Sequence, residues 1–536
     1  MKRVLVIVSA TFLALQVRAQ SVEEGVKLYN YERYESAKQA LLPLAANNPE
    51  ANYYLGLSEI GLDSLDAAKA VFGKDPSNFY NEAGMARVLF MEGKKDEAGK
   101  LLNDIVDHAK KKDWERYKVA ADAITYTKGG DINSAIAWYQ QALEKNQDAM
   151  IYIGLGDAYL KMQTGGGEAM NNYEKAVEKG TANSLAYSRI GYLWYVAHNY
   201  DDALKSYNQA KDADPANPLP YRDLAQAYQR AGKYENALQN DEEYLSKSDK
   251  NINDQINYAN ILFLAKKYPE AAAKMEELIG KGAEKPYMYR IIGYSAYETK
   301  DYPKALSNMQ TFFSKEKDTS ELINDDYIYS GKIYIAMAES DSVNARQYTD
   351  SATAYFNRAV ANDTAADKSE LYRAVADGYK DAKQYGEAGK WYGKIIAAKP
   401  DAPALDYFYW GYWNYFGKNY DEAAKAFAQM KTKYPKEGSA YYWIARVAAA
   451  KDSEAKTGGA VQPYKDWLDF NAEGYEHKDA DLMYAYQYLT YYYYNQKNKA
   501  EAMTWDAKIL EKDPSNEFAL SIKKYFETPQ KEAPQK

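Results

Sequence analysis

A pair of residues recurs along this chain at a fixed interval. The pair is a tyrosine followed three residues later by an alanine, and it occurs four times with a period of 34 residues, at Tyr200/Ala203, Tyr234/Ala237, Tyr268/Ala271 and Tyr302/Ala305. The same pair stands outside this run at Tyr34/Ala37, Tyr385/Ala388 and Tyr420/Ala423. A period of about 34 residues is typical of stacked helix–turn–helix repeats. It therefore predicts an all-helical solenoid, in which each repeat buries its apolar surface against its neighbours.

The repeat at 184–217 shows how the pattern encodes two facing helices. Ala203 and Tyr207 are four residues apart, so they share one face of a helix. Small side chains at Gly191 and Ala203 allow the two helices to approach closely, and Pro215 cannot continue the second helix. By this pattern, repeats begin near residues 18, 49, 79, 116, 149, 184, 218, 252, 286, 324, 369, 404, 438 and 483, which makes about fourteen helix pairs.

The pattern resembles the tetratricopeptide repeat, whose helix A carries Gly and aromatic residues and whose helix B carries Ala, an aromatic residue, Ala and Pro. The sets that carry the resemblance include Gly156/Tyr159 with Ala169/Tyr173/Ala176, Ile292/Gly293 with Ala305/Met309/Phe312, Gly331/Tyr334 with Ala352/Phe356/Ala359, and Trp410/Gly411 with Ala423/Phe427/Pro435. The resemblance covers nearly all of the chain after residue 19. It implies a right-handed superhelix of antiparallel pairs, with helix A of each pair on a concave inner wall.

Two positions depart from this pattern. Asp241 and Asp506 stand where helix B normally carries its aromatic residue, which suggests a shifted helix or an exposed edge. The largest interruption is at 451–480, where Pro463 and the residues after it indicate a displaced second helix behind a Gly458-Gly459 loop.

The start of the chain is typical of a secretory signal peptide. Lys2 and Arg3 precede an apolar stretch that is too short to span a bilayer, and small residues follow at the position where cleavage before Gln20 is expected. No later apolar run is long enough to span a bilayer. We expect four segments, namely a signal peptide at 1–19, an N-terminal solenoid at 20–315, a C-terminal solenoid at 320–528 that is interrupted at 451–480, and a disordered tail at 529–536, with 313–323 as the joint between the halves.

The composition argues against several classes of chemistry. The formal net charge is −8, which disfavours nucleic acid as a partner. The chain has no cysteine, which excludes disulfides and thiolate metal sites. Its three histidines, His108, His198 and His477, fall in different repeats and cannot converge on one metal. A solenoid also lacks the closed pocket that shifts carboxylate pKa values for catalysis. We expect no enzymatic activity, no cofactor and no metal.

The resemblance also implies which side chains face a partner, because the second, fifth, ninth and twelfth positions of helix A point to the inner wall. Tyr and Arg are enriched among residues that dominate protein-binding energy, and Arg can form a bidentate bond to a carboxylate. The positions read in this way are Tyr192, Tyr195, Arg222, Tyr287, Arg290, Tyr294, Tyr297, Arg373, Phe408, Tyr412, Tyr415, Tyr442, Arg446, Tyr484, Tyr491 and Tyr494.

These features favour an exported scaffold that binds protein or peptide partners in its concave groove. An exported, cysteine-free tetratricopeptide solenoid resembles periplasmic proteins of Gram-negative bacteria. Two alternatives stay open. The aromatic residues could stack on a glycan. The run Tyr491–Tyr494 covers every face of a helix, so its rings could also pair across a homo-oligomer interface. The sequence does not identify the partner.

Overall fold

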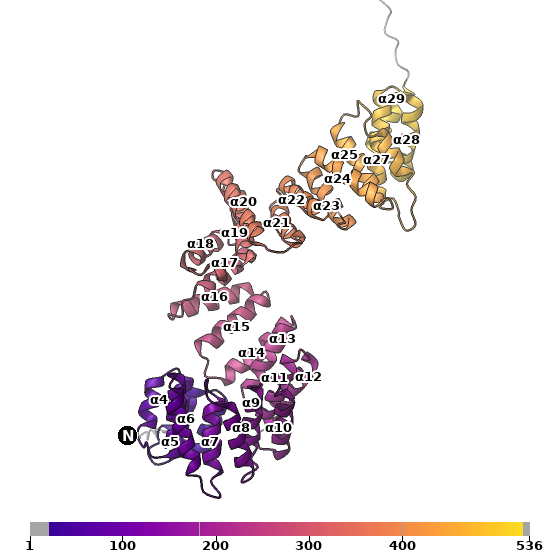
Figure 1. Ribbon diagram of the computed structural model, residues 1–536. Helices are drawn as coiled ribbons and strands as arrows, with labels where there is room; N and C mark the ends of the chain where they lie inside the picture. The colour runs from indigo at the N-terminus through magenta and orange to yellow at the C-terminus, as the bar shows by residue number, and fades with distance from the viewer. Residues whose placement is uncertain (1–20, 182, 400, 529–536) are drawn as a thin grey trace, which may run out of the picture. The chain divides into compact units, whose positions relative to one another are not determined.

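The computed structural model describes residues 21–528 except 182 and 400. Every regular element within these residues is a helix (Figure 1), which confirms the predicted all-helical fold. The predicted signal peptide at 1–19 and the predicted tail at 529–536 lie outside the described residues. None of the described helices combines the length and the apolar character needed to cross a membrane.

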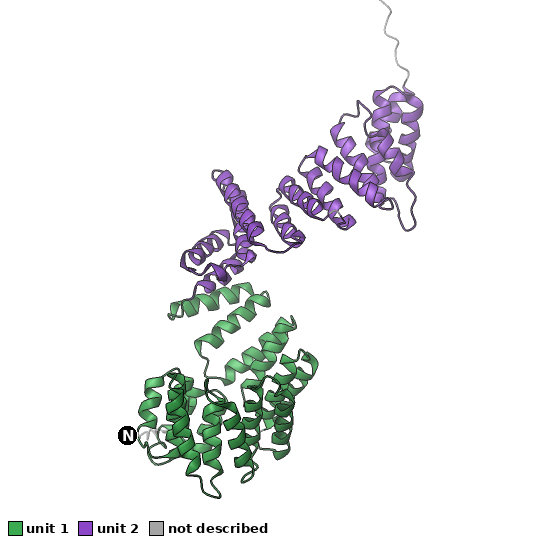
Figure 2. Ribbon diagram, viewed as in Figure 1, with its two compact units in different colours: residues 1–284 green, residues 285–536 purple. Residues whose placement is uncertain are grey.

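The helices form two compact units, residues 1–284 and residues 285–536 (Figure 2). The helices of unit 1, with helix A of each pair first, are α1 (Val22–Asn30) and α2 (Tyr34–Leu41), α3 (Pro49–Gly61) and α4 (Leu65–Phe72), α5 (Phe79–Met91) and α6 (Lys95–Asp107), α7 (Trp114–Thr125) and α8 (Ile132–Leu143), α9 (Ala149–Leu160) and α10 (Gly166–Lys179), α11 (Asn183–Val196) and α12 (Tyr200–Ala213), α13 (Leu219–Arg230) and α14 (Tyr234–Lys247), and α15 (Ile252–Leu264) and α16 (Tyr268–Gly280).

Unit 2 continues the same alternation and ends on a single helix. Its helices are α17 (Pro286–Glu298) and α18 (Tyr302–Lys315), α19 (Asn324–Ser340) and α20 (Ala345–Asn362), α21 (Ser369–Asp381) and α22 (Tyr385–Ala398), α23 (Ala404–Phe416) and α24 (Tyr420–Lys433), α25 (Gly438–Lys451) and α26 (Val461–Leu468), α27 (Asp479–Asn495) and α28 (Lys499–Lys512), and α29 (Glu517–Glu527), with a 3-10 turn, η1 (Thr319–Glu321), before α19. The helix pairs begin within a few residues of the predicted positions.

The predicted joint at 313–323 lies inside unit 2. There α18 and α19 pack against each other on either side of η1. The Arg290 side chain of α17 also reaches across this segment, because its guanidinium donates to the Glu321 carbonyl at 2.6 Å and to the Asp326 carboxylate at 2.7 Å. The segment is therefore held by contacts on both sides.

The turn inside most of the pairs is built in the same way, and the turns before α8, α10, α20 and α26 differ from it. The second residue before helix B adopts a left-handed conformation, as at Lys266 (φ 60°) and Lys383 (φ 54°). The next residue then donates its N–H to a carbonyl five residues back, as Lys267 does to Leu262 at 2.9 Å. This bond satisfies a carbonyl that the end of helix A would otherwise leave unpaired. The shared turn explains why the pairs stack with a regular repeat.

Packing inside a pair depends on a glycine in helix A that receives a large side chain from helix B. A Cβ atom on Gly331 would lie 2.4 Å from the Phe356 ring, and one on Gly411 would lie 2.5 Å from the Phe427 ring. Both phenylalanines are fully buried. The glycines therefore set how closely the two helices approach, as their spacing in the sequence predicts.

Asp241 and Asp506 do not lie at an exposed edge, so that expectation is wrong. They are 1% and 0% exposed within regular helices. Burial, with a contribution from nearby Asp254, raises the pKa of Asp241 to about 7. Burial likewise raises the pKa of Asp506 to about 6. Both oxygens of Asp506 and one of Asp241 lack a hydrogen-bond partner among the described residues, so each carboxyl occupies an aromatic position at an energetic cost.

The interrupted repeat contains the displaced helix that the sequence indicates. Helix α26 follows a loop that is folded around Asp452, whose carboxylate accepts backbone N–H groups from Lys456 at 2.9 Å and Gly458 at 2.9 Å. The Tyr488 hydroxyl of α27 donates to the same carboxylate at 2.7 Å. The loop is therefore a fixed part of unit 2.

Candidate functional site

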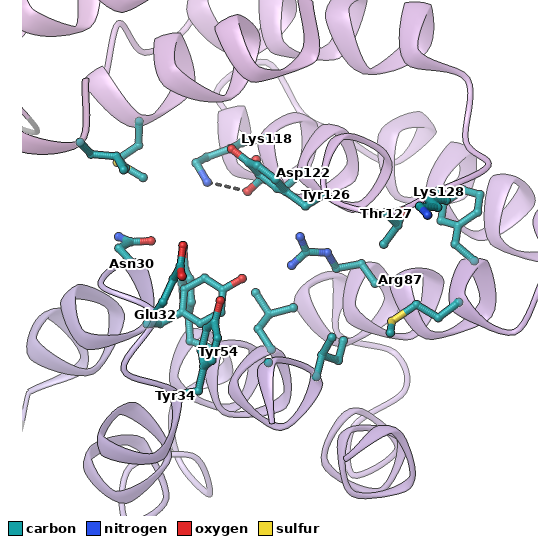
Figure 3. Close-up of a pocket in the computed structure, with 18 of the residues that line it drawn as sticks. Asn30, Glu32, Tyr34, Tyr54, Arg87, Lys118, Asp122, Tyr126, Thr127 and Lys128 are labelled. Carbon is teal, nitrogen blue, oxygen red and sulfur yellow. Dashed lines mark hydrogen bonds and ion pairs between the residues drawn. The ribbon is translucent and has the colours of Figure 1, made fainter. Parts of the chain in front are cut away.

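A cavity of about 740 Å³ lies on the inner face of unit 1 (Figure 3). Most of its lining residues come from helices α1, α3, α5, α7, α9, α11 and α13, and the rest are Tyr34 at the start of α2 and residues of the turns that follow the A helices. These are the A helices of seven consecutive pairs. The A helices therefore form the inner wall of unit 1.

The first helix pair closes this wall by returning to the sixth and seventh pairs. The contacts join residues 183 to 216 positions apart in the sequence and all of them are polar. We call them the closing contacts, and they are Tyr31 and Lys27 with Asp214, Arg33 and Ser36 with Asp249, and Glu32 with Arg222. The turn that makes them also contributes Asn30 and Glu32 to the cavity lining. The closing contacts thus complete the wall around the cavity.

The cavity lining carries an excess of positive charge. It has five cationic side chains, Arg87, Lys118, Lys128, Lys161 and Arg189, and two carboxylates, Glu32 and Asp122. Lys118 Nζ is ion-paired with Asp122 at 2.7 Å, and Arg189 with Asp157 at 2.9 Å. The balance is opposite in sign to the net charge of the whole chain.

Arg87 is the buried cation of this set and is 6% exposed. In Figure 3 its guanidinium points into the space between Tyr34 and Tyr54 on one side and Tyr126 on the other, and it lies 5.5 Å from the centre of the Tyr126 ring. Burial acts against its charge, but Tyr29, Tyr53 and Asp122 outweigh this effect and hold its pKa above the ordinary value. Arg87 forms no ion pair with a carboxylate of the described residues.

Two predicted residues lie in a second hollow of about 650 Å³ on the same wall. Tyr192 and Arg222 both line it. Tyr192 is 49% exposed and free to contact a partner, whereas the Arg222 guanidinium is engaged by Glu32 in the closing contacts. Tyr195 lies half-buried at 5.8 Å from the Tyr200 ring.

The predicted residues of α17 contact their own chain. Arg290 forms a bidentate ion pair with Asp326, and the Tyr294 hydroxyl donates to the same carboxylate at 2.7 Å. The Tyr329 ring stacks on Tyr294 at 3.9 Å, and Tyr294 is buried. The other two predicted residues of this helix, Tyr287 and Tyr297, are half-buried.

The predicted residues of α21 and α23 are also engaged by the next A helix. Arg373 is ion-paired with Asp406 at 2.7 Å. Phe408 and Tyr412 lie 6.2 and 5.0 Å from the Trp443 ring of α25. These side chains join successive A helices and are half-buried.

Four predicted residues come together in unit 2. Tyr415, Arg446, Tyr484 and Tyr491 line a cleft of about 500 Å³ between α23, α25, α27 and α29. Tyr464, Tyr488 and Phe518 complete its aromatic lining. The cleft is therefore a surface of rings around one guanidinium.

Arg446 is held by tyrosines and not by an acid. Its guanidinium donates to the Tyr442 hydroxyl at 3.2 Å and to the Tyr415 hydroxyl at 3.3 Å, and it lies 4.1 Å from the centre of the Tyr484 ring. Tyr442 is buried and so acts as a support, while Tyr484 is 53% exposed. No carboxylate of the described residues is ion-paired with Arg446. Its unused donors and the exposed rings beside it can bind an acceptor group attached to an apolar side chain.

The tyrosine run near the end of the chain is covered mainly by α29. Tyr491 lies 6.3 Å from Phe518, and Tyr494 lies 4.8 Å from Tyr525. Tyr493 accepts a hydrogen bond from Lys465 Nζ at 3.1 Å. Side chains of the same chain therefore contact these rings, while Tyr491 stays 38% exposed and lines the cleft.

The residues around the unit 1 cavity are absent from the predicted set. The predicted set begins in the repeat at 184, yet the ninth position of the repeat that begins at 79 is Arg87. The same rule that selects Tyr192 would have selected it. Among the described residues, no group of three or more acids and histidines is placed to hold a metal ion.

Two family models match the chain. A TPR repeat model matches residues 125–163 and a tetratricopeptide repeat model matches residues 166–218. The chain therefore contains tetratricopeptide repeats. The matched stretches run from the end of α7 through α12, inside unit 1, and the tetratricopeptide pattern of paired helices continues through both units.

Several solved tetratricopeptide structures are similar to this chain. The C-terminal part of a TPR repeat-containing protein from Cytophaga hutchinsonii is 26% identical, with 50% of this chain and 98% of that chain covered and a TM-score of 0.38. A tetratricopeptide repeat protein from Parabacteroides merdae is 18% identical, with 49% and 98% covered and a TM-score of 0.32. YrrB, a TPR protein with an unusual peptide-binding site, is 17% identical, with 34% and 94% covered and a TM-score of 0.31. No curated protein sequence matches the chain.

Proposed function

We propose that this protein is a non-enzymatic scaffold whose inner wall binds a peptide segment of a partner protein, with the aromatic cleft of unit 2 as the main contact. Tetratricopeptide repeats serve in general as protein-interaction modules, because their stacked helices present an extended concave surface. The finer assignment to the cleft rests on the side chains gathered there.

The observation that carries the proposal is the state of Arg446 and Tyr484. The guanidinium is oriented by two tyrosine hydroxyls but has no carboxylate partner among the described residues, and the ring beside it is 53% exposed. Residues that dominate binding energy are commonly Tyr and Arg in a partly desolvated pocket. The cleft therefore suits a segment that inserts an apolar side chain between the rings and offers an acceptor to Arg446.

We further propose that the protein is exported and acts in the cell envelope. The charged start, apolar stretch and small-residue site of 1–19 support this. Fractionation of the native host followed by mass measurement of the mature chain tests it. Recovery from the cytoplasm with the first nineteen residues still present would refute export.

The binding proposal is tested with a random peptide library displayed on phage and selected against the full chain. We expect selected peptides to bind Arg446→Gln and Tyr484→Ala at least about tenfold more weakly than wild type, because each change removes a central contact. Arg346→Gln and Tyr525→Ala alter an exposed arginine and tyrosine of unit 2 outside the cleft and serve as matched controls. Peptides that bind all variants equally, or no enrichment at all, would refute the proposal.

The exposed Tyr484 ring also suits stacking on a sugar, so the same variants decide the glycan alternative. Titration with oligosaccharides can be followed by the fluorescence of Trp443, which lies 5.1 Å from Tyr415. A saturable change that disappears in Tyr484→Ala, together with no enriched peptide, would favour a glycan ligand over a peptide.

A further inference from the structure

We infer that the unit 1 cavity is a separate binding site for an organic carboxylate, whose charged group binds Arg87 and whose apolar part lies among Tyr34, Tyr54 and Tyr126. This site lies in a different compact unit from the cleft assigned to peptide binding, so the two assignments succeed or fail independently.

Arg87 is buried without a carboxylate partner among the described residues. A buried charge is normally paired, because removing it from water is costly. Asp122, the carboxylate that acts on its charge, is already ion-paired with Lys118 at 2.7 Å and accepts a hydrogen bond from the Tyr139 hydroxyl at 2.6 Å. Arg87 is therefore a buried cation that faces a cavity without an anion of its own.

The lining as a whole also carries more cationic side chains than carboxylates. Lys128 and Lys161 add two exposed cations at the cavity edge, and no ion pair of either is found among the described residues. A concave surface lined by charges of one sign focuses the potential and attracts ions of the opposite sign. In a chain of net charge −8, a cavity with five cations and two carboxylates selects an anion.

The size of the cavity and its apolar lining suit a small organic ligand. Its volume of about 740 Å³ falls within the range of roughly 300–1,000 Å³ typical of small-molecule sites. Tyr54, Leu57 and Phe90 supply apolar surface to the lining, and Glu32, which takes part in the closing contacts, lies beside Tyr34 and Tyr54. An arginine beside aromatic rings can bind a ligand that carries a carboxylate on a flat apolar group.

Such a carboxylate can be a free small molecule or the end of a peptide, and the two sources share this chemistry. Isothermal titration calorimetry on the full chain separates them with two pairs of probes, namely 3-phenylpropanoate with its amide, and acetyl-Gly-Gly-Phe with its C-terminal amide. We expect wild type to bind at least one carboxylate about tenfold more tightly than its amide, since the amide cannot form the charge-assisted fork. The pair that shows the preference identifies the source.

Arg87→Gln is expected to abolish this preference and to leave the affinity for the amide within about twofold. Arg116→Gln is the matched control, because Arg116 also lies over an aromatic ring, Phe79, at 4.7 Å, but does not line the cavity. Since Arg87 is buried and its loss can destabilise the fold, the exposed pair Lys128→Gln with Lys161→Gln gives a second test, with an expected loss of a few-fold in carboxylate affinity alone.

Arg446→Gln must leave carboxylate binding unchanged, which keeps this test distinct from that of the unit 2 cleft. Equal wild-type affinity for carboxylate and amide in both probe pairs would overturn the inference. A preference that survives in both Arg87→Gln and the double lysine variant would overturn it as well, as would the absence of saturable binding by either carboxylate.

Discussion

Unit 1 and unit 2 share one repeat and differ in what their inner walls present. The wall of unit 1 is closed by the return of its first helix pair and encloses a cationic cavity. The wall of unit 2 ends on α29 and presents an aromatic cleft around one arginine. Both use glycine and alanine to pack the pairs, so the difference lies in the inward positions of helix A and in the closing contacts of unit 1. The repeat fixes the architecture, and a few side chains per repeat decide the binding chemistry.

The largest expected effect comes from truncating a core ring in each unit. Phe72, which lies against Gly56 and Gly84, and Phe427, which lies against Gly411, are both buried. Each change to Ala should lower the free energy of unfolding by about 3–5 kcal/mol. Hydrogen exchange should show that Phe72→Ala also loosens α13 and α14 through the closing contacts, whereas Phe427→Ala loosens only neighbouring pairs.

The exposed Leu42, changed to Ala, is the control and should leave exchange almost unaltered. If Phe72→Ala affects only the adjacent pairs, the closing contacts do not couple the ends of unit 1, and the contrast between the units disappears.

The buried acids should give the next largest effect, with a definite pH dependence. The folded pKa values of Asp241 and Asp506, about 7 and about 6, lie above the ordinary value of 3.8. The folded state therefore binds a proton at these carboxyls more tightly than the unfolded state does. The stability that protonation of the two carboxyls gives to the folded state is fully present below about pH 3.8 and is lost as the pH rises through the folded pKa. At pH 8, Asp241→Asn should raise the free energy of unfolding by roughly 2–4 kcal/mol, and Asp506→Asn by less.

Urea unfolding at pH 5 and pH 8 measures this difference. The gain should shrink at pH 5 for both variants, and more completely for Asp241. A gain that is independent of pH would show that these carboxyls titrate normally in the folded protein.

The closing contacts should contribute less to the free energy of unfolding than the core rings do. Asp249→Asn removes the charge that binds Arg33 at 3.2 Å and weakens the bond to Ser36, and we expect a loss of about 1–2 kcal/mol that falls at high salt. Hydrogen exchange of α1 and α2 is the readout. Asp421→Asn in unit 2, which breaks a surface ion pair with Lys451, is the matched control and should cost less than about 0.5 kcal/mol.

The same contacts should weaken in acid. Burial acts to raise the pKa of Asp214, but the bonds from Tyr31 and Lys27 outweigh it and lower that pKa below its ordinary value. Its stabilising effect is therefore present above the unfolded pKa and is lost as pH falls through the folded one. Exchange protection of α1 that persists unchanged well below pH 3 would contradict this assignment.

The smallest effect concerns the shared turn. Lys266 in unit 1 and Lys383 in unit 2 both adopt left-handed backbone conformations. Changing either to Gly should relieve strain of about 1–2 kcal/mol, most of which is offset by the greater freedom of Gly in the unfolded chain, for a net gain of about 0.5 kcal/mol. Thermal unfolding should give equal gains for the two variants, and a clear difference would show that the turns are not equivalent.

The helix pairs were predictable because their signal is local. Glycine, alanine and aromatic spacings within about 34 residues determine where each pair begins and how it packs. The burial of Asp241 and Asp506 was not predictable from this pattern, because a polar residue at a packing position can be buried or can shift its helix, and only the surrounding side chains decide.

The sequence predicts which positions of helix A face the inner wall, but it does not predict which of those side chains stay available to a partner. Tyr294 stands at an inward position, yet Tyr329 of the next A helix covers it and Asp326 binds its hydroxyl. Arg446 also stands at an inward position, but its hydrogen-bond partners are the hydroxyls of Tyr442 and Tyr415 and not a carboxylate, so its charge stays available to a ligand in the groove. The closing contacts escaped prediction altogether, since joining residues about 200 positions apart depends on the summed twist of seven pairs.

A solenoid whose two ends are not joined extends easily, because a small change in angle between each helix pair and the next adds to its length. The return of α1 and α2 to the later pairs removes that freedom from unit 1. Pulling on unit 1 must first break a handful of polar bonds in one step, whereas unit 2 can yield gradually along its length. Under tension unit 1 should therefore resist extension up to a threshold force, and unit 2 should extend elastically.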